Sequence, residues 1–274
     1  MLRQFLFGAM LITSFTGASV ANDSYVAQGV SVRLNGQQEA TEELHRTFPL
    51  AANGVVSLEN YAGIIRIKTW ERNAIKIDAV KRSSRRERLA EVDIIIDASQ
   101  NHISIKTKYA KENLSWNDDE AGLLNNPASV SYSLTIPTNA RLDKIDLLNG
   151  TAEIEGVKGG IKATSVNAGF TLRSIAGNVD ISTVNGQLEA IYEKQNEAST
   201  VSLSAVNGQL ILTAAADASV QFNAYTMNGV FKNEFNADVN HTASDSPTGK
   251  IGRGDARIKL NSMNGNVNVR RAGL

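Results

Sequence analysis

The sequence predicts an all-β protein built as a β-solenoid, a β-helix-like array of short strands in coils of about 18–22 residues. Two observations carry this prediction. A bend motif of an apolar residue, Asn and Gly recurs through the second half of the chain. Apolar and polar residues then alternate directly after each bend. A repeat near 20 residues is too short to bury its own apolar face, so neighbouring repeats must stack.

The bend motif occurs six times, and its Asn residues are separated by 18, 18, 22, 21 and 36 residues. Asn and Gly tolerate positive φ and suit tight corners. We therefore interpret them as structural turn residues rather than as a ligand-binding row. In stacked coils, the Asn side chains are also placed to form a hydrogen-bonded ladder. The turn residues are Asn149, Gly150, Asn167, Gly169, Asn185, Gly186, Asn207, Gly208, Asn228, Gly229, Asn264 and Gly265.

The residues after each bend show which side chains are buried. Counted from each Asn, the third and fifth residues are apolar in five of the six repeats, and a different residue separates them. This period of two is typical of a strand with one buried face. The predicted inward residues are Ala152, Ile154, Phe170, Leu172, Leu188, Ala190, Leu210, Leu212, Val267 and Val269. Glu153, Thr171, Glu189 and Asn268 are expected to point outward, as is Gln209 beside Leu210.

The first 21 residues are expected to be a signal peptide. Arg3 precedes an apolar stretch from Phe5 to about Phe15, and Ser19-Val20-Ala21 places cleavage before Asn22. The mature protein is then expected to be exported. It would lie either in the periplasm or outside the cell, at the cell surface. No later segment has the roughly 20 apolar residues of a spanning helix, so no integral membrane span is expected after cleavage.

We divide the mature chain into two parts. Residues 22–54 are expected to be an irregular capping segment, with a possible short helix at Thr41–His45. Residues 55–270 are expected to be the repeat domain, with irregular loops at about 112–128 and 236–255. The long final Asn spacing is interpreted as one coil plus the second of these loops.

Composition excludes several classes of function. The chain has 28 basic and 28 acidic residues, which gives no electrostatic basis for nucleic-acid binding. It has no Cys, so disulfides and Cys-ligated metals are excluded. His45, His102 and His241 show no metal-ligand spacing. No Gly-x-Ser-x-Gly motif is present. We expect no catalytic site, no metal and no cofactor.

Three charged features leave alternatives open. The acidic triplet Asp118–Glu120 is either a solvated loop or a calcium loop. Glu153, Asp180 and Glu189 would be the carboxylates of a polysaccharide-cleaving β-helix, if they gather on one face. A basic stretch is either a solvated connection or a contact to an anionic surface. Its cations are Lys81, Arg82, Arg85, Arg86 and Arg88.

Three elements of the chain together resemble a known family. They are Gly63–Glu71 followed by Ile75–Ile77, the strand-like Tyr132–Pro137, and the Asn-Gly repeats that follow. In this combination the chain resembles the bacterial DUF4097 family, whose members are also called candidate adhesins or β-strand-repeat proteins. The resemblance spans about Val55 to Val269. It implies a β-solenoid-like fold, an extracytoplasmic envelope context and no catalytic residues.

The sequence thus predicts a non-enzymatic secreted or periplasmic envelope protein. It would present a repetitive β-surface to an envelope protein or a glycan, as an adhesin does. Two alternatives remain. One is a polysaccharide-acting enzyme. The other is a self-associating structural component, whose uncapped strand edges stack on another copy.

Overall fold

The computed structural model describes residues 39–110, 128–192, 200–215, 217–235 and 247–272. These residues form strands and one short 3-10 helix, η1, which confirms the predicted all-β class. The elements are β1 (Ala40–Pro49), β2 (Val55–Trp70), β3 (Ala74–Ser83), η1 (Arg86–Glu91), β4 (Val92–Ala98), β5 (His102–Tyr109), β6 (Ser129–Pro137), β7 (Arg141–Glu155), β8 (Ile161–Arg173), β9 (Val179–Asn185), β10 (Leu188–Tyr192), β11 (Thr200–Asn207), β12 (Leu210–Ala214), β13 (Val220–Asn228), β14 (Phe231–Asn233), β15 (Thr248–Ile251), β16 (Ala256–Asn264) and β17 (Val267–Arg271).

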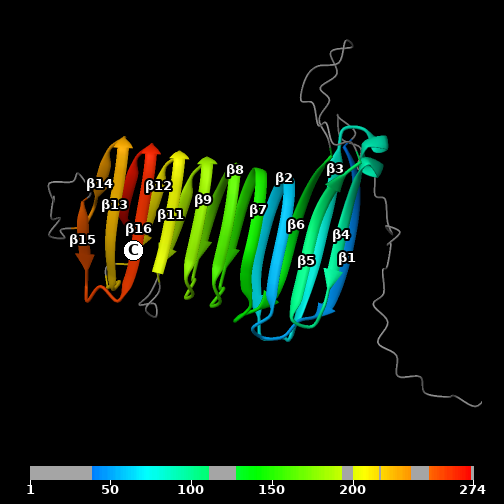
Figure 1. The fold of residues 1–274 in the computed structure, drawn as a ribbon, viewed down its shortest axis with the longest axis horizontal. Helices are drawn as coiled ribbons and strands as arrows, with labels where there is room; N and C mark the ends of the chain where they lie inside the picture. Colours follow the sequence, from blue (N-terminus) through cyan, green and yellow to red (C-terminus); the bar gives the residue numbers. More distant parts are fainter. Residues whose placement is uncertain (1–38, 111–127, 193–199, 216, 236–246, 273–274) are drawn as a thin grey trace, which may run out of the picture.

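The strands pair in two ladders that share one apolar core (Figure 1). The first ladder runs β4-β5-β2-β7-β8-β9-β11-β16-β13-β15. The second runs β1-β3-β6-β2-β7-β8-β10-β12-β17-β14. The long strands β2, β7 and β8 bend once and so contribute to both ladders. Pairing is parallel from β5 to β13 and from β6 to β14, and antiparallel outside these limits. Each bend, with the strand segments on either side of it, is one stacked unit.

Alternate residues of both ladders point into the core. All ten predicted inward residues are at most 2% exposed, which confirms the phase counted from Asn. Fully burying one such Leu or Val side chain stabilises the fold by about 1.5–3 kcal/mol. Asn268 differs from expectation, because it is only 8% exposed. Its partners across the ladder are Ile211 and Lys232.

The units do not stack in the order of the chain. Strand β16 pairs with both β11 and β13, and β17 pairs with both β12 and β14. The last unit therefore lies between two earlier ones. The segment 236–255, expected to be an irregular loop, contains β15, which pairs antiparallel with β13 at the outer edge. Residues 236–246 lie outside the described residues.

The possible short helix at Thr41–His45 does not form, and the expected irregular capping segment 22–54 contains a regular strand. Residues 40–49 form β1, which pairs antiparallel with β3 over its whole length. Leu44 and Phe48 pack against the core from this strand. Pairing with β3 thus outweighs a local helical preference, as tertiary context often does.

Two other sequence expectations fall wholly or almost wholly outside the described residues, and a third can be placed. The signal peptide and nearly all of the loop at 112–128 fall outside the described residues. The basic stretch begins in β3 and ends in η1. Within the part of the chain that the structure describes, there is no helix of the length and apolarity needed to cross a membrane.

Candidate binding surface

The bends line up along one side of the stack, which we call the Asn edge. In each unit, an apolar residue, an Asn and a small residue occupy the same register as in the neighbouring units. In stack order, the Asn edge consists of Leu148–Asn149–Gly150, Val166–Asn167–Ala168, Val184–Asn185–Gly186, Val206–Asn207–Gly208, Met263–Asn264–Gly265 and Met227–Asn228–Gly229. None of these residues is charged.

The Asn side chains form a continuous amide ladder of one polarity. Each Nδ2 donates to Oδ1 of the unit before it in the stack, at 2.8–3.0 Å. The ladder follows the spatial order, so Asn264 donates to Asn207 and accepts from Asn228. An amide has two N–H donors and two acceptor lone pairs, so each Asn within the ladder keeps one of each for another partner.

The apolar residue before each Asn lies at the surface of the Asn edge, and Leu148 is half-buried there. Five of these six side chains are large and exposed: Val166 (40%), Val184 (40%), Val206 (38%), Met263 (49%) and Met227 (60%). Because neighbouring strands lie about 4.8 Å apart, the six positions from Leu148 to Met227 extend over roughly 25 Å. We call this row of side chains the apolar stripe.

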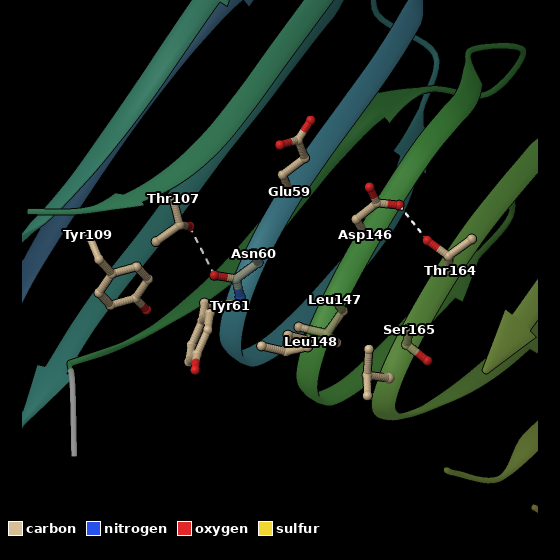
Figure 2. A pocket seen from close by; sticks show the side chains of 11 residues that line it. Glu59, Asn60, Tyr61, Thr107, Tyr109, Asp146, Leu147, Leu148, Thr164 and Ser165 are labelled. Atoms are coloured by element: carbon tan, nitrogen blue, oxygen red, sulfur yellow. Dashed lines mark hydrogen bonds between the residues drawn. The ribbon is translucent and has the colours of Figure 1, made fainter. Parts of the chain in front are cut away.

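A hollow of about 420 Å³ lies at the Leu148 end of the stripe. Tyr61 is next in register, because its neighbour Ala62 pairs with Asn149. The Tyr61 and Tyr109 rings meet edge to face, with centroids 5.2 Å apart. Figure 2 shows both tyrosines and Leu148 near the bends, and Glu59 and Asp146 on the strands above them. The hollow thus joins the end of the stripe to the polar face of the first ladder.

The polar groups that line the hollow already have partners. The Thr107 hydroxyl donates to Asn60 Oδ1 at 2.9 Å and lies 2.7 Å from the Tyr132 hydroxyl. Tyr109 donates to the Ala128 carbonyl at 2.9 Å, and burial raises the pKa of its hydroxyl. The Tyr61, Leu148 and Val166 side chains supply apolar contact area in the lining of the hollow.

The carboxylates at the rim of the hollow are also paired. Glu59 contacts Lys144 Nζ at 2.7 Å and Lys106 Nζ at 3.2 Å. The hydrogen bond from Lys144, and then that from Lys106, lower the pKa of Glu59 despite partial desolvation. Asp146 accepts from Thr164 at 2.6 Å and contacts Lys144 at 3.2 Å. The lowered pKa of Glu59 suits binding and positioning rather than proton transfer at neutral pH.

Beside the Asn edge, the first ladder presents a row of uncharged polar side chains. They lie in register on neighbouring strands, and the row begins next to Asp146. We call them the polar row: Thr164, Ser182, Ser204, Asn261 and Tyr225. Thr164 and Ser182 are exposed and the other three are half-buried. The row offers hydroxyl and amide groups at a regular spacing of about 4.8 Å.

The structure does not bring the three candidate catalytic carboxylates together. Asp180 lies in β9 of the first ladder, whereas Glu153 and Glu189 lie in the second. Glu153 pairs with Arg66 at 3.2 Å, and Glu189 accepts from the Thr213 hydroxyl at 3.5 Å. Glu153 and Glu189 share one row of the second ladder on either side of Thr171, and Asp180 lies apart from both.

The other candidate groups are scattered. His45 contacts Asp78 at 2.7 Å and Glu43 at 3.4 Å, and the hydrogen bond that His45 donates to Asp78 raises the pKa of this imidazole despite slight desolvation. His102 lies 3.4 Å from the Ser57 hydroxyl. Among the described residues, no group of three or more metal-ligating side chains occurs. His241 and the triplet Asp118–Glu120 lie outside those residues.

The basic stretch is partly neutralised locally. Lys81 pairs with Glu42 at 2.9 Å, and both side chains are mostly buried. Arg88 contacts Glu91 at 3.6 Å. Arg82 and Arg86 are exposed, and Arg85 is half-buried. The five cations therefore do not form one free basic patch.

Comparison with known families fits the stacked architecture. Residues 158–270 match the family model described as Toastrack DUF4097. This match confirms the DUF4097 resemblance over residues 158–270. The matched Toastrack segment runs from before β8 to β17, so it includes every unit of the Asn edge except that of β7.

Two solved structures are similar to this chain at low sequence identity, and the first of them supports the fold alone. A crystal structure described as a candidate cell adhesion protein from Clostridium sporogenes is 12% identical, with a TM-score of 0.50, over 84% of this chain and 100% of that one. A structure described as a candidate adhesin from Bacteroides fragilis is 11% identical, with a TM-score of 0.38, over 84% of this chain and 97% of that one. Comparison with curated proteins gives no match.

Proposed function

We propose that this chain is an exported, non-enzymatic binding protein, adhesin-like in action, in which a β-solenoid presents the polar row to an extended glycan. The observation that carries the proposal is the in-register row from Thr164 to Tyr225 on one face of a stack of paired strands. Asp180 lies apart from Glu153 and Glu189, and Glu153 is engaged by Arg66, which supports binding without cleavage.

The chemistry of the polar row favours a sugar polymer. Each side chain has a donor and an acceptor, which matches the hydroxyl groups of a glycan. The row lies on strands held by ladder hydrogen bonds on both sides, so little conformational entropy is lost when a ligand binds. An extended ligand lying across the strands would contact several units at once, and its affinity would come from many individually weak hydrogen bonds.

The test compares two double variants with the unchanged protein. Ser182→Ala with Ser204→Ala removes two hydroxyls from the polar row. Thr171→Ala with Thr213→Ala removes two from the second ladder as the matched control. At about 1 kcal/mol per hydrogen bond, we expect the first variant to bind its glycan about ten- to thirtyfold more weakly, and the control to bind as the unchanged protein does.

Binding would be measured against immobilised peptidoglycan, lipopolysaccharide and a neutral glucan, with reducing ends assayed in the same samples. The proposal predicts retention by one of these glycans and no release of reducing ends. Failure to bind all three, or equal weakening by both double variants, would contradict it. Release of reducing ends would instead support the enzyme alternative.

A further inference from the structure

The apolar stripe is unusual for a surface that faces water. Five large side chains, 38–60% exposed, follow one another along the Asn edge without a charged residue between them. Monomeric proteins rarely expose contiguous apolar patches beyond a few hundred Å², and such patches mark interaction sites. The glycan proposed above does not account for the stripe, because its contacts are with the polar row.

A second copy of this chain has the surface that matches the Asn edge best. Its apolar stripe has the same spacing, so side chains from two facing edges can interdigitate at every unit. A two-fold axis that lies between the edges, perpendicular to the stack, puts stripe on stripe and amide ladder on amide ladder. The spare N–H and lone pair of each ladder Asn then face their counterparts. The residues of the Asn edge carry no charge, and this favours the pairing, because a two-fold axis would bring like charges of the two copies together.

The two ends of the edge are also complementary in shape. Under this axis the two stacks run in opposite directions, so the Met227 unit of one copy faces the Leu148 unit of the other. The Met263 unit likewise faces the Val166 unit. The hollow lies at Leu148 and Val166, whereas the two most exposed stripe side chains are Met227 and Met263.

We infer that two copies of the protein pair edge to edge, with Met227 and Met263 of each seated in the hollow of the other. Methionine is flexible and packs well into irregular gaps, and its sulfur makes favourable contacts with aromatic rings such as that of Tyr61. Val184 and Val206 then lie on either side of the two-fold axis. The interface is isologous and closes as a dimer.

The size of the edge sets the expected affinity. An edge roughly 25 Å long and about 15 Å wide buries on the order of 400 Å² per copy, which is the size of weak, reversible interfaces. We therefore expect a dimer that forms in the micromolar range and dissociates on dilution.

Sedimentation velocity from about 1 to about 500 µM tests the pairing. We expect the unchanged mature protein to pass from monomer to dimer, whereas Val206→Lys and Met227→Lys should remain monomeric throughout. Val206→Lys places two like charges near the axis, and both positions are exposed, so the fold should tolerate them. Thr171→Lys, on the second ladder, is the matched control and should dimerise normally. A protein that is monomeric over the whole range, or a dimer unaffected by both edge variants, would overturn the inference.

Disulfide cross-linking tests the direction of pairing. The chain has no Cys of its own, so only the introduced Cys residues can form a disulfide. Val184→Cys and Val206→Cys would be prepared separately, mixed and oxidised. Opposite-running edges place these positions face to face, so the mixture should form cross-linked dimers faster than either variant alone. Edges that run in the same direction would link each variant to itself instead, and that result would contradict the proposed axis.

Discussion

Gly150→Ala is expected to destabilise the protein by about 3–5 kcal/mol, because two separate penalties combine. Gly150 has φ +139°, a conformation that residues with a side chain rarely adopt. An added Cβ would also overlap the carbonyl oxygen of Gly63 in the neighbouring bend. Strands β2 and β7 would have to separate where they turn, next to the hollow and at the start of the amide ladder.

The control is Gly160→Ala, where the nearest atom to an added Cβ is the Asn178 carbonyl oxygen at 3.6 Å. We expect this variant to change the free energy of unfolding by less than about 1 kcal/mol. Urea denaturation followed by circular dichroism measures both. Similar urea midpoints of unfolding for the two variants would show that β2 and β7 do not approach this closely at Gly63 and Gly150.

Leu210→Asp is expected to unfold the stacked units around β12. Leu210 is 0% exposed and lies in register between Leu188 and Val267. A carboxylate there loses its hydration without gaining a partner, and the cost of several kcal/mol exceeds what one unit contributes. Because units of a stacked array stabilise their neighbours, β10 and β17 should be lost with β12.

Gln209→Asp tests whether Leu210→Asp unfolds these units because its side chain points into the core. Gln209 is adjacent in sequence but only half-buried, so its carboxylate keeps contact with water. Limited proteolysis should cut the Leu210 variant rapidly between β10 and β17 and leave the Gln209 variant as resistant as the unchanged protein. Equal resistance of the two variants would mean that the inward assignment of β12 is wrong.

The sequence predicts the local features of each unit well, because they repeat. Counting from Asn places Leu210 and Val267 inward, since every bend starts its strand in the same phase. The same count also separates the candidate carboxylates. Glu153 and Glu189 follow a bend and so belong to the second ladder, whereas Asp180 precedes one and belongs to the first.

Features that depend on pairing between distant segments could not be predicted. The position of β16 between β11 and β13 is set by contacts across the stack, and the sequence carries no marker of that order. The hollow could not be predicted for the same reason, because Tyr61 and Tyr109 meet only through the pairing of β2 with β5. The apolar residue before each Asn was visible as part of the motif, but its exposure follows from its place at the tip of the bend.

The amide ladder and both proposed binding surfaces depend on the order of the stacked units, and two pairs of cysteine substitutions test that order directly. Asn207 and Asn264 are ladder neighbours, so Asn207→Cys with Asn264→Cys should form an intramolecular disulfide in monomeric protein. Asn207 and Asn228 are two strands apart, about 9.6 Å, which is too far for a disulfide. We therefore predict rapid oxidation of the first pair and none of the second. Oxidation of the second pair and not the first would mean that the units follow the chain, and would contradict the amide ladder and the surfaces built on it.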